Sequence, residues 1–317
     1  MTVHVNDVVA TFHDLCAGFG VDGPSDASAQ FRTLVSPSWN RYRSDLLAHR
    51  SALTETGAPV EISIKIDGRG DVSLRYVVDA ADHSLDITGN VETYIAAAQL
   101  ASGQPEGPLR RLFGTHLDGC APHTLPTVMH GVGLASGGRR RGSLYFPAGW
   151  LETDELLQRL PHPTTLPRRA EVVGYDFSAS GLTRWKTYHW LPIDPRRPMA
   201  DRSEIEEQLP HAAAVYDHFA SSVPGQVRGT ATFLQQSIDG AGRHQRIFFF
   251  TRPWGWASPT GLGLVLGFLS AIVEIDLKTP LQLVRSVTRN HGLAVHLGLV
   301  AIGGNTNPSL TLYFWPK

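Results

Sequence analysis

A pattern in which apolar and polar residues alternate recurs five times along the chain. In residues 60–67, for example, three isoleucines alternate with a glutamate, a serine and a lysine, which is typical of a β-strand with one buried face. Each such strand runs into a turn rich in Gly, Ser, Asn or Asp, and a second alternating strand follows. The turns lie at 67–71, 136–138, 178–181, 239–242 and 303–307. The pattern therefore predicts five β-hairpins.

Stretches with apolar residues at helical spacing separate the hairpins. The predicted strands are 60–67, 71–79, 126–135, 140–147, 170–178, 183–191, 227–237, 243–251, 292–302 and 308–316. The predicted helices are 4–20, 27–35, 38–56, 90–101, 106–114, 151–160, 202–222, 259–272 and 278–290. Because the pattern extends from one end of the chain to the other, we expect residues 1–317 to form one domain.

One face of the predicted strands is apolar, whereas the opposite face combines charged and aromatic side chains. Two sandwiches or an open sheet are alternatives to a barrel, but an open sheet would expose this second face to water. A closed barrel encloses it, removes the unpaired sheet edges and is wide enough, at about ten strands, to hold a small molecule. We therefore expect an α+β fold, a ten-stranded antiparallel β-barrel with a solvent-filled lumen and a surrounding ring of α-helices.

Composition narrows the class of protein. The 317 residues are 42% hydrophobic and 18% charged, as in an ordinary soluble globular protein. A formal net charge of −1 gives no general basic surface for nucleic acid or an anionic membrane. The apolar stretch 261–275 is too short for a membrane span, and the first residues lack a signal-peptide pattern. Cys16 and Cys120 have no pairing motif, so we expect a cytoplasmic protein.

Cations and aromatic side chains share the predicted inner face. The cations are Lys65, Arg75, Arg141, Lys186 and Arg246, the tyrosines are Tyr145, Tyr188 and Tyr313, and the other rings are Trp190, Phe248, Phe250 and Trp315. Cations and tyrosine hydroxyls donate hydrogen bonds to phosphate oxygens, and aromatic faces stabilise a carbocation. This distribution suits an allylic diphosphate. The alternative is a solvated strand face with cross-strand aromatic pairs.

Three segments carry a resemblance to a known family. Residues 173–190 form a strand, a turn and a strand with a Lys-x-Tyr sequence, residues 309–315 form an aromatic last strand, and residues 60–66 precede a Leu-Arg-Tyr sequence at 74–76. Together they resemble the ABBA-type, or PT-barrel, aromatic prenyltransferases, which have five ααββ repeats, and in particular the compact bacterial indole and peptide members of cyanobactin type. Thr311 departs from the pattern, because many members have Lys or Arg there.

The resemblance implies roles for individual residues. Glu61 would accept the proton that the aromatic acceptor loses, although a lumenal ion pair with Lys65 or Arg75 is the alternative for this carboxylate. The implied diphosphate ligands are Arg75, Lys186, Tyr188, Arg141, Arg246, Tyr313 and Lys65. The implied prenyl and acceptor pocket consists of Trp190, Phe248, Phe250, Trp315, Tyr145 and Asp176.

The sequence thus predicts a prenyltransferase that moves a prenyl group, dimethylallyl in the first place, from dimethylallyl or geranyl diphosphate to an indole, a tryptophan or a Trp- or Tyr-containing peptide. The alternatives are a non-catalytic barrel that carries a hydrophobic anion and a prenyltransferase for phenolic polyketides. No Asp-rich or His-Glu-x-x-His motif is present, so no metal ligands are predicted. Because lumenal cations can neutralise the diphosphate, no cofactor is expected and Mg²⁺ is not expected to be essential.

Overall fold

The computed structural model of the chain describes residues 3–46, 48–118, 128–135, 140–148, 170–191, 232–239, 242–251, 263, 266–267, 269–271, 274–303 and 308–316. The helices with defined bounds are α1 (Val5–Gly18), α2 (Pro24–Ser44), α3 (Ile87–Ser102), α4 (Glu106–Leu117) and α9 (Lys278–Asn290). The strands are β1 (Val60–Asp67), β2 (Val72–Asp79), β3 (Met129–Ala135), β4 (Arg140–Pro147), β5 (Val172–Ser178), β6 (Gly181–Leu191), β7 (Thr232–Asp239), β8 (Gly242–Phe250), β9 (Val295–Gly303) and β10 (Ser309–Pro316).

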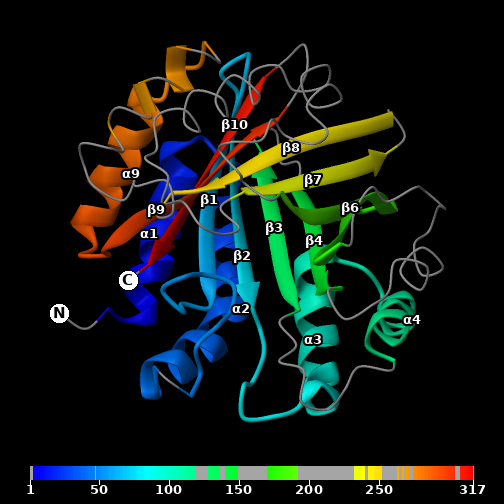
Figure 1. Cartoon of the computed structure of the whole chain (residues 1–317). Helices are drawn as coiled ribbons and strands as arrows, with labels where there is room; N and C mark the ends of the chain where they lie inside the picture. Colours follow the sequence, from blue (N-terminus) through cyan, green and yellow to red (C-terminus); the bar gives the residue numbers. More distant parts are fainter. Residues whose placement is uncertain are drawn as a thin grey trace, which may run out of the picture.

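The ten strands form one closed antiparallel barrel in the order β1-β10-β9-β8-β7-β6-β5-β4-β3-β2 (Figure 1). Each hairpin pairs with the next, and β10 closes the ring on β1 through Ile62 opposite Phe314 and Asp67 opposite Ser309. The prediction of a ten-stranded antiparallel barrel with helices around it is confirmed. In the first turn Gly70 has a φ of 81°, a conformation that glycine adopts without steric cost. The predicted turn at 136–138, residues 304–307 of the turn predicted at 303–307, and the centre of the one at 239–242 lie outside the described residues.

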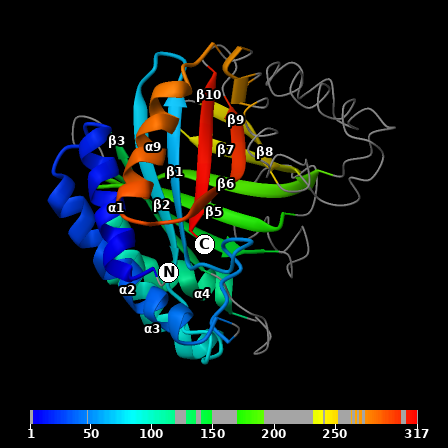
Figure 2. The same cartoon turned by 90° about the vertical axis from the view of Figure 1, so that its left-hand side faces the viewer.

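The outer face of the barrel forms the main hydrophobic core. Ile64, Tyr76 and Leu312 are fully buried there together with α1, α2 and α9 (Figure 2). The rings of Phe12 on α1 and Phe31 on α2 lie 4.3 Å apart. A second core joins α3 and α4 to the outer faces of β4 and β5. The apolar strand positions therefore face the helices, as the alternation predicts.

The prediction of two helices at 27–35 and 38–56 is wrong, because α2 continues without a break from Pro24 to Ser44. Pro37 lies inside this helix, although proline removes a backbone donor there. The neighbouring Val35 and Trp39 are almost completely buried, and tertiary packing overrides the local penalty. Residues 48–59 form turns and a loop instead of a helix. The helices predicted at 151–160 and 202–222 lie outside the described residues.

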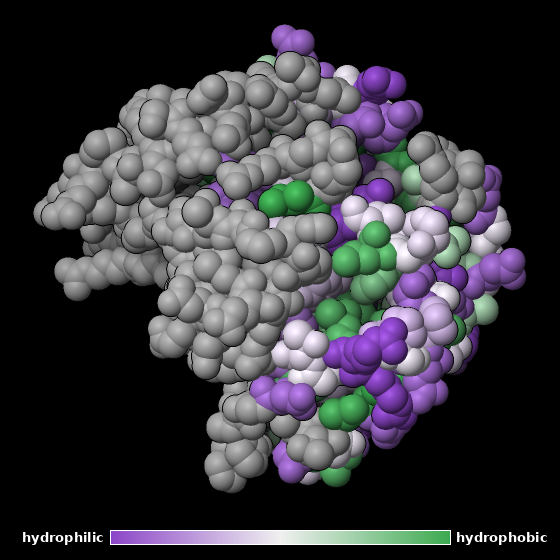
Figure 3. Space-filling model, turned by 90° about the vertical axis from the view of Figure 1, so that its right-hand side faces the viewer, coloured by the Kyte–Doolittle hydropathy of each residue, from purple (hydrophilic) through white to green (hydrophobic). Residues whose placement is uncertain are grey.

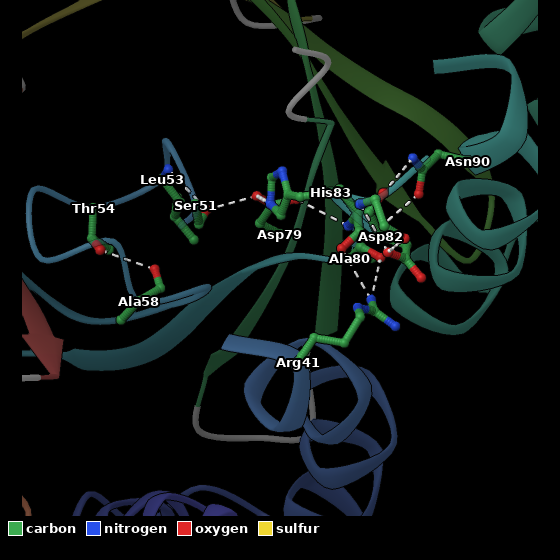
Figure 4. Close-up of polar contacts among 12 residues, drawn as sticks. Arg41, Ser51, Leu53, Thr54, Ala58, Asp79, Ala80, Asp82, His83 and Asn90 are labelled. Carbon is green, nitrogen blue, oxygen red and sulfur yellow. Dashed lines mark hydrogen bonds and ion pairs between the residues drawn. The ribbon is translucent and has the colours of Figure 1, made fainter. Parts of the chain in front are cut away.

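A polar network ties this loop to the end of β2 (Figure 4). The Ser51 hydroxyl donates to Asp79 at 2.6 Å, and His83 Nε2 lies 3.1 Å from the same carboxylate oxygen. Arg41 on α2 donates to the carbonyls of Ala80 and Ala81 at 3.2 and 3.0 Å. Asp79 is fully buried, and its contacts with Ser51 and His83 give this polar side chain the partners that burial requires.

Most large apolar side chains in the described part of the chain are buried. Leu46, Leu85 and Leu182 are the exposed large ones among these residues, and on the side shown in Figure 3 the hydrophobic surface is divided into separate patches by hydrophilic residues. None of the helices in the described ranges is long and apolar enough to cross a membrane. Cys16 is a buried free thiol on α1, and Cys120 lies outside the described residues.

Candidate active site in the barrel lumen

The strand register brings the predicted site residues to the inner face of the barrel. Glu61 and Lys65 alternate with outer-face isoleucines on β1, where Ser63 lies between Tyr313 and Arg75 of the neighbouring strands. The same phase holds for Arg75 on β2, Arg141 and Tyr145 on β4, Asp176 on β5, Lys186 and Tyr188 on β6, Arg246, Phe248 and Phe250 on β8, and Tyr313 and Trp315 on β10. Trp190 is opposite Phe233 in the register.

Glu61 lies at one end of this surface and is 5% exposed. Trp315 Nε1 donates a hydrogen bond to Glu61 Oε2 at 2.8 Å. Among the described residues no cation lies within 4 Å of the Glu61 carboxylate, so the alternative of an ion pair with Lys65 or Arg75 is wrong for this structure. Burial raises the pKa of Glu61 to about 7, while the Trp315 N–H and the charge of Arg75 act in the opposite direction. A carboxylate with this pKa can accept a proton near neutral pH.

Asp176 is the second buried carboxylate of the lumen, and it is strongly paired. The Lys186 ammonium contacts Asp176 Oδ1, and the Ser143 hydroxyl donates to the same oxygen at 2.6 Å. Arg141 Nη1 lies 3.9 Å from Oδ2, and its side chain is half-exposed. Burial alone would raise the pKa of Asp176, but Lys186 and Ser143 hold it below its usual value. Asp176 therefore stays ionised and neutralises Lys186.

Three inner-face cations have no such partner. Within the described ranges, Lys65, Arg75 and Arg246 have no carboxylate within 4 Å. Burial, followed by the charges of Arg246, Arg75 and Arg184, lowers the pKa of Lys65 to about 7. Burial also lowers the pKa of Arg246, and Arg75 and Arg184 contribute in the same direction. Cations from β1, β2, β6 and β8 thus converge, an arrangement that a bound polyanion would stabilise.

A row of aromatic rings lies between the cations. The ring centroids of Tyr145 and Tyr188 are 6.0 Å apart, those of Tyr188 and Phe248 are 5.8 Å apart, and those of Phe248 and Tyr313 are 5.7 Å apart. Lys186 Nζ lies 5.2 Å from the centroid of the Tyr145 ring. Rings from β4, β6, β8 and β10 therefore form a continuous aromatic wall that can face an apolar chain or a developing positive charge.

The three tyrosine hydroxyls of this wall differ in acidity. Arg75 Nη2 donates to the Tyr145 hydroxyl at 3.2 Å. Burial alone would raise the pKa of Tyr145, but the charges of Lys186 and Arg75 lower it below its usual value. Burial raises the pKa of both Tyr188 and Tyr313. Tyr188 and Tyr313 are thus neutral hydrogen-bond donors at physiological pH.

Sequence reasoning missed two kinds of residue. Arg184 lies on the same face of β6 as Lys186, opposite Asp176 and Asp239, and the alternation along β6 could have identified it. Gly298 and Gly174 give room to rings on the neighbouring strands. A Cβ at Gly298 would lie 2.2 Å from the indole of Trp315, and one at Gly174 would lie 2.9 Å from the ring of Tyr145. Such contacts between strands leave no signal in a single sequence.

The described residues contain no group of three or more His, Cys, Asp or Glu side chains that could hold a metal ion. The acidic stretches 152–155 and 201–207 lie outside these residues.

Comparison with known proteins places the fold. No protein-family model matches the chain, and no curated protein sequence matches it. Among solved structures, 5-dimethylallyltryptophan synthase from Streptomyces coelicolor is 15% identical with a TM-score of 0.73, over 99% of this chain and 97% of that one. This chain has the barrel fold of that prenyltransferase. At this identity the similarity shows the fold.

Two further structures match over a similar extent. The 6-dimethylallyltryptophan synthase from Micromonospora olivasterospora, solved in complex with DMASPP and Trp, is 14% identical with a TM-score of 0.72, over 99% of this chain and 97% of that one. The prenyltransferase PriB, solved as a ternary complex with L-tryptophan and dimethylallyl thiolodiphosphate, is 17% identical with a TM-score of 0.70, over 98% and 96% of the two chains. The ABBA-type barrel predicted from the repeats is therefore the observed fold.

Proposed function

We propose that this chain is an aromatic prenyltransferase, a single domain that transfers a dimethylallyl group from an allylic diphosphate to tryptophan or another indole. The observation that carries the proposal is the combination, on one enclosed surface, of cations with no carboxylate within 4 Å among the described residues, an aromatic wall and a buried carboxylate with a pKa of about 7. Three structures with the same fold are prenyltransferases, and two of them were solved with tryptophan and an allylic diphosphate analogue. A carrier of a hydrophobic anion would need no such carboxylate.

The reaction would proceed in balanced steps. The bond between the allylic carbon and the diphosphate oxygen breaks, and pyrophosphate leaves with the electron pair. Arg75, Arg246 and Lys65 would stabilise its charge, with Tyr188 and Tyr313 as neutral donors. The aromatic wall would stabilise the allylic cation. The acceptor ring then forms a new bond to the allylic carbon, and its displaced proton passes to Glu61 as the ring regains aromaticity.

Lys186 would have a different role from the one that the sequence predicts. Its ammonium is paired with Asp176, so it attracts an anion less strongly than Arg75 or Arg246 does. It lies over the Tyr145 ring. Together with Arg75 it lowers the pKa of the Tyr145 hydroxyl by more than burial raises it. We therefore propose that Lys186 and Asp176 position Tyr145 and set its acidity. Lys186 would contact a diphosphate oxygen only while it remains paired with Asp176.

The protein's own cations would supply the charge that Mg²⁺ supplies in other diphosphate enzymes. We therefore expect chelation with EDTA to leave most of the turnover intact. A loss of turnover that Mg²⁺ restores would contradict this part of the proposal.

The test is to mix the protein with dimethylallyl or geranyl diphosphate and a panel of acceptors: tryptophan, simple indoles, phenols, and peptides with Trp or Tyr. Mass spectrometry of the acceptor and an assay of released pyrophosphate are the measurements. A prenylated indole together with stoichiometric pyrophosphate supports the proposal. Binding of the diphosphate without pyrophosphate release under every pairing would instead indicate a carrier, and a product only from peptides or phenols would replace tryptophan as the acceptor.

A further inference from the structure

The partner of Glu61 in this structure is an indole from the chain itself. Trp315 is on β10 at the position next to the pair formed by Ile62 and Phe314, so its side chain lies beside that of Glu61 across the strands. Trp315 is 1% exposed. Its Nε1 lies 2.8 Å from Glu61 Oε2. Within the described part of the chain, this N–H is the one side-chain donor that reaches the carboxylate.

The indole occupies a space that β9 leaves open for it. The register between β9 and β10 shifts between Tyr313 and Phe314, which pair with Leu299 and Leu297. Gly298 is therefore the extra residue of a β-bulge. A Cβ at Gly298 would lie 2.2 to 2.4 Å from three atoms of the Trp315 ring. The ring is almost completely buried, and on this side the β9 backbone packs directly against it.

The β-bulge is held by Thr251, the residue that follows β8. The Thr251 backbone N–H donates to the Gly298 carbonyl at 2.9 Å, and the Thr251 hydroxyl donates to the carbonyl of Leu297 at 2.5 Å. His296, opposite Trp315 in the register, places its ring edge-on to the indole at 5.3 Å. The indole is thus confined by the Gly298 backbone and His296, and its N–H is directed at Glu61.

From this geometry we infer that Trp315 is a positioning residue for Glu61, and that Gly298 provides the space that directs the indole N–H at the carboxylate. The inference rests on the proposed role of Glu61 as the base. An indole N–H donates and cannot accept a proton. It fixes Oε2 without adding a formal charge, and it leaves Oε1 free to receive the acceptor's proton. An arginine in its place would hold both oxygens and stabilise the carboxylate too strongly for a base.

Other charged or titratable groups lie near this carboxylate or its partner. Arg75 on β2 lowers its pKa, Tyr313 on β10 interacts with it electrostatically, and His296 on β9 contacts Trp315. The experiment must therefore separate the effect of the Trp315 N–H from these three groups.

A direct test follows the indole N–H of Trp315 by NMR in ¹⁵N-labelled protein, from about pH 5 to about pH 9. The signal is assigned by its loss in Trp315→Phe. We expect it to shift with a midpoint near the Glu61 pKa of about 7 and to stop shifting in Glu61→Gln. A shift that persists in Glu61→Gln would assign the titration to another group of the lumen and overturn the pairing. This measurement needs no substrate, so it remains decisive even where the proposed reaction fails.

The kinetic test compares Trp315→Phe and Gly298→Ala with the unmodified protein. Both variants should move the acid limb of the rate–pH profile upward by about one pH unit, because the carboxylate loses a donor that favours its charged form. At pH values well above the limb, turnover should recover to within a few-fold. An unchanged acid limb in Trp315→Phe would overturn the positioning role.

A control variant separates the positioning role from a merely structural effect. Ile64→Val removes one methyl from the same strand, β1, on its outer face, where Ile64 is fully buried. It should lower stability and leave the acid limb where it is. If Gly298→Ala fails to fold, Trp315→Phe together with the NMR titration still decides the matter. If no variant and no unmodified protein releases pyrophosphate, the proposed function fails while the titration continues to test the pair.

Discussion

Glu61 and Asp176 are buried carboxylates of the same lumen, and their surroundings give them opposite properties. Glu61 has a neutral donor, Trp315, and burial raises its pKa to about 7. Asp176 has the Lys186 ammonium and the Ser143 hydroxyl, and its pKa is below the usual value despite its burial. One carboxylate is thus suited to accept a proton, and the other to remain a fixed negative charge. Different surroundings can give two carboxyl groups of one site different pKa values, and therefore different roles in the reaction.

The largest expected effect is the loss of turnover when Glu61 is replaced. Glu61→Gln keeps the shape and can still accept the Trp315 hydrogen bond, but it removes the proposed base. We expect turnover to fall by about 100-fold or more, with binding of the allylic diphosphate nearly unchanged, in a pyrophosphate-release assay with tryptophan. Glu92→Gln is the matched control, since Glu92 forms an exposed ion pair with Arg110 and should change little. Full turnover in Glu61→Gln would show that another group takes the proton.

At Asp176 the expected loss is in stability. Asp176→Asn leaves the Lys186 ammonium buried without its counter-ion, and breaking a buried pair from one side costs about 3 kcal/mol. Urea denaturation at neutral pH should measure this loss as a lower free energy of unfolding. The matched control is Asp71→Asn at the exposed turn between β1 and β2, which should be close to neutral. An equally small effect at Asp176 would mean that water reaches and compensates Lys186.

The converging cations provide the next prediction. Arg246→Gln removes a charge that has no carboxylate partner among the described residues, so the loss should appear in ligand affinity. We expect dimethylallyl thiolodiphosphate to bind about 10-fold more weakly, measured by calorimetry, with the free energy of unfolding unchanged or higher. Arg69→Gln, at the exposed first turn, is the control. Unchanged affinity in Arg246→Gln would move the anion site away from β8.

The smallest expected effect is on the pH dependence of folding stability, which should have opposite signs for the two carboxylates. Because the pKa of Glu61 is raised from 4.5 to about 7 on folding, the folded state binds more protons in this window, and stability falls as pH rises through it. Glu61→Gln should therefore be more stable than the unmodified protein at about pH 8, by at least about 1 kcal/mol. Asp176, with a lowered pKa, contributes stability that is present at neutral pH and lost at acid pH. Thermal melts of both variants at acid and alkaline pH check the two signs.

The strands and their faces could be predicted because alternation is a local property. The isoleucines of β1 and the valine, tyrosine and phenylalanine of β5 face the helices, as their spacing predicts. Helix bounds were less predictable. Pro37 suggests a break, yet α2 passes through it because Val35 and Trp39 are held in the core on both sides. Propensity is a weak local preference that packing of this kind overrides.

For the candidate site, alternation along each strand was enough to predict which residues share the inner face, since a residue's phase along its strand assigns it to one side of the barrel. The pairing of these residues with one another depends on the three-dimensional arrangement of the strands. Lys186 could have served an anion alone, but the pairing of β5 with β6 brings it against Asp176. Glu61 could have formed an ion pair with Arg75, but the closure of β1 on β10 and the space at Gly298 give it the indole of Trp315 instead. Pairing across strands far apart in sequence depends on register and on the size of facing side chains, and neither is encoded in the periodicity of one strand.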